Sequence, residues 1–353
     1  MTSELPASGE QAVRPTIKAV ARHAEVSYQT VSNALNAPDR LKPATLARVL
    51  KSVEELGYQP SQAARNLRTQ RTRLIGFRFE QTAGAGIASI EDRFLHAVCA
   101  AARDRGYGVI VFSAEDDDDE IAMYSDLTRR GAVDGFILMN SHRVDPRPAW
   151  LIERCIPFVC FGRPWQRTSR VHSWLDVDGG SGTYLAVRHL VEGRHRRIGF
   201  IGWPEGSEVG DDRHSGWLAA TTEFGLPKRG LTVRGLDGIA VGTQLAEQLL
   251  SSAKPPSALV CVSDAMAVGA MHAAQQRGLV VGRDVAVVGF DDSPLATVVK
   301  PTLTSLRQPL ESIAQKCIDL LVGHIDDPAK RAVTSVMEPT VIVRESSAVI
   351  TDD

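Results

Sequence analysis

A length of 353 residues allows two or three domains, and 43% hydrophobic with 23% charged residues is ordinary for a soluble globular chain. No apolar run reaches the ~20 residues that a membrane span needs. The first fifteen residues lack the apolar stretch of a secretory signal, so we expect a cytoplasmic protein. Residues 1–73 contain 11 Lys and Arg against 6 Asp and Glu, although the net charge of the whole chain is −2. A basic head on an acidic body favours contact with phosphates at one end only.

The sequence predicts no metal and no cofactor. The acidic run Glu115–Glu120 is interpreted as a solvated helix start, because carboxylates favour that end of the helix dipole. The nine histidines, His189 and His195 included, show no zinc-site spacing. Five cysteines, an odd number without a CxxC pair, are interpreted as reduced and mostly buried. These are Cys99, Cys155, Cys160, Cys261 and Cys317.

Residues 16–36 have the pattern of two short helices joined by a tight turn. Thr16 is placed to cap the first helix, and Ser27 is placed to cap the second. Val31 and Leu35 lie on the buried face of the second helix. The side chains left outside can donate to and accept from base edges, and they are Tyr28, Gln29, Ser32 and Asn33. This arrangement is the helix-turn-helix plan of DNA-binding proteins.

These residues resemble the headpiece of the LacI/GalR family of bacterial transcription regulators. The resemblance continues through Gly57-Tyr58-Gln59-Pro60 and Ala63–Leu67, and then to about Ser347. It implies a small all-α helix-turn-helix headpiece and an α/β periplasmic-binding-protein-like core of two parallel-sheet subdomains. Such a protein would act as a homodimer on double-stranded operator DNA. No leucine heptad of the kind that tetramerises some members follows the core, which favours a dimer.

Two positions depart from the family pattern. The family usually has Gly where Glu25 stands, which predicts a slightly different turn backbone. It often has Arg where Asn33 stands, and because Arg reads guanine while Asn prefers adenine, we expect an altered operator preference.

The expected boundaries are a disordered lead at 1–14, the headpiece at 15–60, a hinge or linker at 61–72 and the core at 73–347. A third headpiece helix begins at Pro43 and ends at Gly57. Its apolar stripe consists of Leu46, Val49, Leu50, Val53 and Leu56. The resemblance places 73–163 and 293–325 in subdomain one, and 164–292 and 326–347 in subdomain two.

Residues 61–72 can form a short helix capped by Ser61 or a plain basic linker. The resemblance implies a hinge helix that orders only on DNA, where Leu67 opens the central base step from the minor groove. An exposed leucine among four arginines fits an apolar wedge flanked by cations. The expected DNA contacts are therefore Thr16, Ser27, Tyr28, Gln29, Thr30, Ser32, Asn33, Ala64 and Leu67.

From Arg73 onward, apolar strand patterns alternate with helical ones. This alternation predicts parallel sheets covered on both faces, with ligands bound at the carboxyl ends of the strands. The expected strands are 74–79, 109–113, 135–139, 158–161, 197–202, 231–235, 258–262 and 285–290. The expected helices are 89–105, 119–130, 183–192, 213–224, 242–252, 264–277 and 309–322. By resemblance, the chain crosses back after residue 303 and returns through 340–343.

The strongest ligand candidates follow strand ends. Arg213 can hold effector hydroxyls or carboxylates with its fork, the alternative being a surface ion pair with a neighbouring Asp. Trp217, one turn later, can equally pack in the core or stack on a sugar. Asp291 matches the effector-binding aspartate of the family, whereas Asp292 is the better turn cap. The expected effector-binding set is Phe79, Arg163, Asp176, Arg213, Trp217, Ser263, Asp291 and Gln308.

Ser263 stands where many relatives have a ligand-binding polar residue, and Asp264 is expected to cap the next helix. Three functions were weighed: a DNA-binding repressor switched by a small effector, a solute-binding component, and an enzyme. The absent signal and the headpiece argue against the second. The absence of phosphate-binding and nucleophile-elbow motifs argues against the third. The effector is expected to be a sugar, with a purine or another metabolite as the alternative, and the sign of its effect stays open.

Overall fold

The computed structural model describes residues 15–58, 71–79, 90–165 and 171–347, and it divides into two units, Met1–Thr72 and Arg73–Asp353. The expected lead at 1–14 and the hinge positions Ala64 and Leu67 lie outside the described residues. None of the described helices combines the length and apolarity that crossing a membrane requires.

The headpiece consists of α1 (Ile17–His23), α2 (Tyr28–Asn36), a 3-10 turn (Pro38–Arg40) and α3 (Pro43–Glu55). Thr16 and Ser27 cap α1 and α2 as predicted, with hydroxyls that accept backbone N–H groups at 3.3 and 3.1 Å. The predicted stripe on α3 is wrong at one position, because the side chain of Leu50 is 47% exposed. The small apolar core consists of Val20, Ala21, Ala24, Val31, Ala34 and Val49.

The turn between α1 and α2 keeps a backbone conformation that glycine favours. Glu25 has φ +52°, in the left-handed region. The expected difference in turn backbone is therefore not found. The chain instead accepts a side chain in a strained conformation, at a cost of about 1 kcal/mol.

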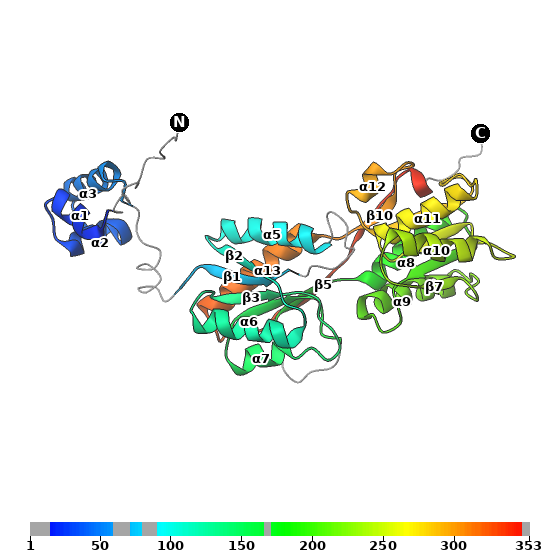
Figure 1. The fold of residues 1–353 in the computed structure, drawn as a ribbon, viewed down its shortest axis with the longest axis horizontal. Coiled ribbons are helices and arrows are strands. Elements are labelled where there is room, and N and C mark those ends of the chain that lie inside the picture. Colours follow the sequence, from blue (N-terminus) through cyan, green and yellow to red (C-terminus); the bar gives the residue numbers. More distant parts are fainter. Residues whose placement is uncertain (1–14, 59–70, 80–89, 166–170, 348–353) are drawn as a thin grey trace, which may run out of the picture. The chain divides into compact units, whose positions relative to one another are not determined.

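The first subdomain is a six-stranded parallel sheet in the order β11-β5-β4-β3-β1-β2. Helices α5 and α13 pack together on one face, and α6 and α7 cover the other (Figure 1). The strands are β1 (Leu74–Arg78), β2 (Gly108–Phe112), β3 (Gly135–Leu138), β4 (Phe158–Phe161), β5 (Trp174–Val177) and β11 (Thr334–Met337). The helices are α5 (Ile90–Asp104), α6 (Asp117–Arg129), α7 (Arg147–Glu153) and α13 (Leu310–Asp326).

The second subdomain has the strand order β12-β10-β9-β8-β6-β7 and is parallel except for the β10–β12 pair. Helices α8 and α9 pack together, as do α10 and α11. The strands are β6 (Ile198–Gly202), β7 (Thr232–Arg234), β8 (Ala258–Cys261), β9 (Ala286–Asp291), β10 (Thr304–Arg307) and β12 (Thr340–Ile342). The helices are α8 (Gly179–Glu192), α9 (Glu208–Glu223), α10 (Ile239–Leu250), α11 (Asp264–Gln276) and the short α12 (Leu295–Val298).

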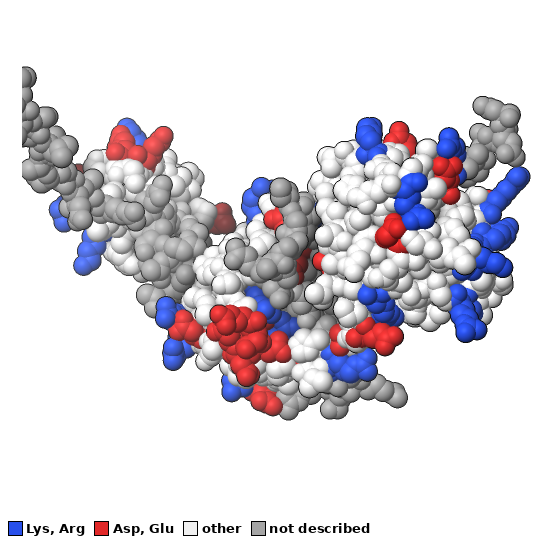
Figure 2. Space-filling view, turned by 45° about the vertical axis from the view of Figure 1, so that its right-hand side comes forward, with Lys and Arg blue, Asp and Glu red and all other residues white. Residues whose placement is uncertain are grey.

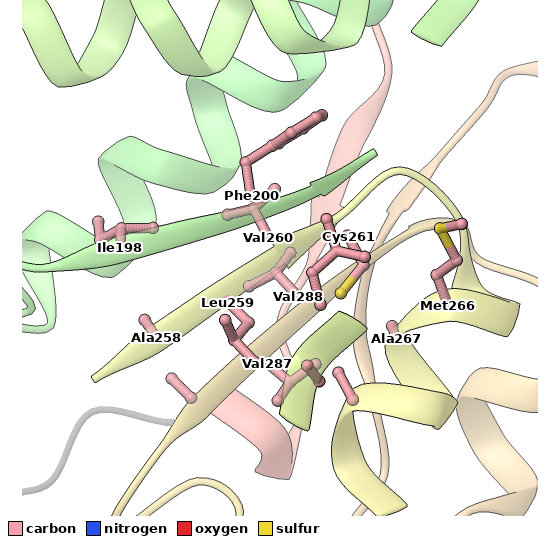
Figure 3. Packing of buried hydrophobic residues seen from close by; sticks show 14 of the residues in the cluster. Ile198, Phe200, Ala258, Leu259, Val260, Cys261, Met266, Ala267, Val287 and Val288 are labelled. Atoms are coloured by element: carbon pink, nitrogen blue, oxygen red, sulfur yellow. The ribbon is translucent and has the colours of Figure 1, made fainter. Parts of the chain in front are cut away.

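The core of the second subdomain lies between its central strands and α11. Phe200 on β6, Val260 on β8 and Val288 on β9 are at most 1% exposed. In Figure 3, Phe200 points away from Met266 and Ala267, which lie at the start of α11. Phe200 packs instead near His214 and Trp217 of α9, so the core extends to both faces of the sheet. β6, β8 and β9 carry apolar residues on both faces of the sheet, because helices cover both faces.

Three strands correct the expected subdomain boundaries. β5 pairs with β4, and β11 pairs with β5, so both belong to the first sheet although they were expected in the second subdomain. β10 pairs with β9 in the second sheet although it was expected in the first subdomain. The chain therefore crosses between subdomains three times, after β5, after β10 and after β11. These strands are short, and each carries a polar residue, which hid them from a search for apolar runs.

Candidate functional site

A cavity of about 170 Å³ lies within the core at the carboxyl ends of strands from both sheets. The first subdomain contributes the segment after β3 and the segment after β4, where Trp165 stands. The second contributes Trp203, directly after β6, and Arg213 on α9. Gln308 follows β10 at one of the crossings. The position agrees with the rule that open α/β sheets bind ligands at the carboxyl ends of their strands.

Arg213 is the charged residue of the second subdomain's wall, and Asp291 lies beside it without lining the cavity. The guanidinium of Arg213 donates to the Val262 carbonyl at 2.5 Å, lies 3.6 Å from the Asp291 carboxylate and stacks at 3.6 Å over the Phe290 ring. Its buried Nε has no hydrogen-bond partner among the described residues. Burial lowers the pKa of Arg213, and Asp291 opposes that effect. The cation is therefore only partly compensated by the protein.

Asp291 is held from several sides. Its carboxylate accepts a hydrogen bond of 2.6 Å from the Gln308 amide, and Arg93 of α5 donates to its backbone carbonyl at 2.6 Å. Burial raises the pKa of Asp291 to about 6, against the lowering effects of Arg213 and Gln308. Its φ of +107° is rare for a residue other than glycine, which marks backbone strain next to the cavity.

Arg163 and Asp176 belong to the first subdomain and meet at the cavity. The Arg163 guanidinium donates to the Asp176 carboxylate and to the Val177 carbonyl, and it lies 3.6 Å from Asp212 of α9. Burial alone would lower the pKa of Arg163, but the hydrogen bond and charge of Asp176 raise it. Burial raises the pKa of Asp212, with Arg163 opposing it. Asp176 lines the cavity, and Arg163 lies behind it.

Ser263, not Asp264, caps α11. The Ser263 hydroxyl accepts the Met266 N–H at 3.2 Å and donates to Asp237, whose carboxylate also accepts the Trp203 indole N–H at 3.0 Å. Asp264 is only 2% exposed and accepts bonds from the Ser305 hydroxyl and the Ser293 N–H. Burial raises the pKa of Asp264 to about 7, and the Asp291 charge adds to the rise.

Five of the eight expected effector residues do not line the cavity, and they are Phe79, Arg163, Trp217, Ser263 and Asp291. Arg163 and Asp291 lie next to residues that do line it, Asp176 and Arg213 respectively. Trp217 is 1% exposed, donates its indole N–H to the Ile198 carbonyl and stacks on His214. Of the two alternatives for Trp217, core packing is therefore the one observed, and the effector role is wrong. Phe79 packs against the core of the first subdomain and does not line the cavity. Phe79 is the first residue after β1, and this position alone does not show whether its ring lines the cavity or packs in the core.

The lining residues missed from the sequence include four with polar or indole side chains: Asn140, Ser141, Trp165 and Trp203. Three of them come within three residues of a strand's end, the signal that selected Arg163 and Asp291. A buried arginine holds the backbone of the segment after β3 in place. Arg147, 1% exposed, donates to the carbonyls of Met139 and Asn140 at 3.0 and 3.1 Å.

The first subdomain balances the charge of Arg147 fully. Its guanidinium also bonds Asp145 and, at 2.8 Å, Glu120, and Glu120 accepts from Arg78 and from Tyr124 as well. Glu120 is the last of four consecutive acidic residues in the first turn of α6. Acidic side chains also gather on the surface of this subdomain (Figure 2). Asp117, His142 and Asp145 lie close enough to share a metal ion, but Arg147 already neutralises these carboxylates. The arrangement therefore does not call for a cation.

The headpiece presents an exposed polar face on α2. Tyr28 is 53% exposed and Gln29 is exposed beside it. The Gln29 amide donates to Asn33 at 3.2 Å, so these two side chains are held together. Thr16 and Ser27 act as caps, and the Thr30 hydroxyl bonds that of Ser27 at 2.8 Å. Ser32 and Asn33 are half-buried, which leaves the start of α2 as its most accessible part.

Comparisons with known proteins agree with this architecture. Residues 16–61 match the model for bacterial regulatory proteins of the lacI family, and residues 187–347 match a periplasmic binding protein-like domain. The transcriptional regulator CelR of Thermobifida fusca is 32% identical over 96% of this chain and 99% of its own length. The HTH-type transcriptional repressor PurR of Photorhabdus laumondii is 31% identical over 94% of this chain and 96% of its own length.

Two solved structures extend the likeness. A CelR–cellobiose complex is 30% identical over 95% of this chain and all of the other, with a TM-score of 0.70. The lac repressor dimer bound to operator and the anti-inducer ONPF is 25% identical over 95% and 99%, with a TM-score of 0.81.

Proposed function

This chain belongs to the lacI family of bacterial regulatory proteins and is a DNA-binding transcription regulator; from that premise we propose that it is a repressor released from its operator by a small sugar. The repressor is a homodimer that places two α2 helices in successive major grooves of a near-palindrome. It acts in the cytoplasm, where that DNA lies, and it has no catalytic role. Leu67 remains the proposed minor-groove wedge.

The observation that carries the sugar proposal is that the Arg213 guanidinium and the Asp176 carboxylate line one cavity together with aromatic side chains. A partly compensated fork and a carboxylate can donate to and accept from adjacent hydroxyls of one ligand. Trp165 and Trp203 supply apolar faces from opposite subdomains. Sugars combine polar edges with apolar ring faces, so this mixture suits them. The CelR relative, solved with cellobiose, supports the same class.

Effector binding would change the angle between the subdomains, because the cavity is built from both. Arg93 of α5 and Arg163 already contact residues of the second subdomain across the gap. An effector that prefers one arrangement shifts the equilibrium toward it, and operator affinity follows by linkage. Release by a sugar is the sign we propose. The PurR relatives favour the alternative, a flat purine that tightens DNA binding.

The test is fluorescence anisotropy of the purified protein on labelled DNA from its own upstream region, with scrambled DNA as the reference. Cellobiose, a panel of other sugars and hypoxanthine are added in turn. Release by one sugar supports the proposal, and tightening by hypoxanthine favours the alternative. Equal, weak binding to upstream, genomic and scrambled DNA in the presence of all these ligands would contradict the repressor.

Two variants separate the DNA site from the effector site. Gln29→Ala should weaken operator binding at least about five-fold, since a base-edge contact contributes about 1–3 kcal/mol, while effector binding is unchanged. Arg213→Ala should bind the operator normally and lose the response to effector. Arg188→Ala, an exposed change on α8, is the matched control for both. A normal effector response in Arg213→Ala would remove Arg213 from the site.

A further inference from the structure

A second and larger cavity, about 300 Å³, lies at the opposite edge of the first sheet. It is bounded by the α7–β4 connection, the first residue of β4 and the residues that precede β5. The end of α13 and the α13–β11 connection close it. These are the amino ends of parallel strands, whereas the effector cavity lies at the carboxyl ends. The two cavities are therefore separated by the length of the sheet.

This second cavity adjoins segments that lead to all three crossings between subdomains. His172 and Ser173 precede β5, and Lys330 and Ala332 precede β11, two strands that continue directly into crossings. His324 lies in the last turn of α13, the helix that follows the crossing after β10. A molecule bound here would touch the first-subdomain part of each crossing segment. None of the residues that line this second cavity belongs to the proposed effector site.

The polar groups of the cavity are donors or cations. The Ser173 hydroxyl accepts the Val333 N–H at 3.0 Å and lies 2.7 Å from His324 Nε2, so it can donate its proton to a neutral imidazole there. Burial lowers the pKa of His324, the Lys330 ammonium lowers it further, and Asp327 opposes them. Among the described lining residues none carries a carboxylate. The described lining therefore offers the Lys330 ammonium no anionic side chain to pair with.

The remaining lining is apolar. Ile152, Ile156 and Phe158 form one side, and the Phe158 ring packs at a tilt against the His172 ring, with 5.3 Å between centroids. An apolar wall facing a cation-rich rim suits a ligand with an apolar body and one negative group. A bare inorganic anion would leave the apolar wall without a partner.

We propose that this cavity is a second ligand site, which binds a small organic carboxylate. The carboxylate contacts the Lys330 ammonium and His324, and the apolar body packs on Ile156 and Phe158. The site is independent of the sugar site, and its ligand need not be related to a sugar.

The test uses benzoate as the probe and benzamide as its neutral isostere, followed through histidine NMR resonances of the full-length protein. The His324 signal is assigned by its loss in His324→Gln. We expect saturable benzoate binding, at least ten-fold weaker binding of benzamide, and a higher pKa for His324 at saturating benzoate.

Lys330→Gln should weaken benzoate binding at least five-fold, and Lys254→Gln, an exposed change in the second subdomain, should not. Both changes are at exposed positions, and circular dichroism checks that the variants fold. Equal affinity for benzoate and benzamide, or unchanged binding in Lys330→Gln, would overturn the carboxylate site. Inorganic phosphate binding as tightly as benzoate would overturn the role of the apolar wall.

Discussion

The two subdomains share one architecture but treat buried charge in opposite ways. In the first, Arg147 is enclosed by Glu120, Asp145 and two backbone carbonyls, and its pKa is raised by these partners in spite of burial. In the second, Arg213 has a lowered pKa and an unpaired Nε, while Asp264 and Asp291 have raised pKa values. The charge of Arg147 is therefore matched by partners within the fold. Arg213 keeps a buried N–H without a partner among the described residues, which is the group that the proposed ligand would use.

The largest expected effect follows from the complete network. Arg147→Met removes one partner and leaves Glu120 and two carbonyls buried, so the free energy of unfolding should fall by about 3–5 kcal/mol. Urea unfolding followed by tryptophan fluorescence measures this change, because all five tryptophans lie between residues 150 and 217. Arg154→Met, on a half-exposed side chain at the end of α7, is the control and should cost less than about 1 kcal/mol. Equal losses in both variants would remove the contrast between the subdomains.

The pH dependence of stability tests the second subdomain, where two buried aspartates have raised pKa values. Asp264 and Asp291 have folded pKa values of about 7 and about 6, above the unfolded value of 3.8. The folded state therefore holds protons that the unfolded state has released, and this stability is complete below pH 4 and lost as pH rises through 6 and 7. We expect the core to lose on the order of 2 kcal/mol between pH 5 and 8.

Two variants identify the source of this loss. Asp264→Asn should flatten the stability profile between pH 5 and 8, because the position no longer titrates. Asp284→Asn should keep the profile of the unchanged protein, since the Arg283 hydrogen bond lowers the pKa of this exposed aspartate. A profile in Asp264→Asn as steep as in the unchanged protein would assign the pH dependence to other groups.

The smallest expected effect comes from the same change at Arg213, the buried arginine of the second subdomain. Arg213→Met removes a buried cation that is poorly compensated, so the desolvation relieved offsets most of the interactions lost. The free energy of unfolding at pH 7 should change by less than about 1 kcal/mol, in the same urea assay. A loss comparable to that of Arg147→Met would mean that the charge of Arg213 is as well compensated as that of Arg147.

Sequence reasoning predicted the elements whose signal is local. Thr16 and Ser27 were recognised as caps because the cap chemistry lies within three residues of the hydroxyl. The apolar strands β3, β4, β8 and β9 were found because both of their faces are buried. β10, with the sequence Thr-Ser-Leu-Arg, was missed, since its polar residues bond side chains rather than solvent. Ser305, for example, donates to Asp264 across 41 residues of sequence.

The site was predictable in part for the same reason. Arg213 was selected by its position after a strand end and by resemblance, Asp176 by its place beyond the crossover and Gln308 by resemblance, and all three line the cavity. Trp217 was misassigned because a helical residue one turn from Arg213 can still point into the core, and only packing decides that. Arg147 was overlooked because its role depends on carbonyls brought close by the fold, which no spacing pattern records.

The triple crossing has a consequence for synthesis of the chain on the ribosome. The first sheet needs β11, and its apolar core needs α13, yet these segments end at residues 337 and 326. The second sheet needs β12, which ends at residue 342. Neither half can be completed as a nascent unit, so more than two hundred residues must emerge with sheet edges open before both halves close almost together. Chain growth should therefore be the period in which this protein most depends on chaperones, and the headpiece, finished within its first sixty residues, would be folded long before the core.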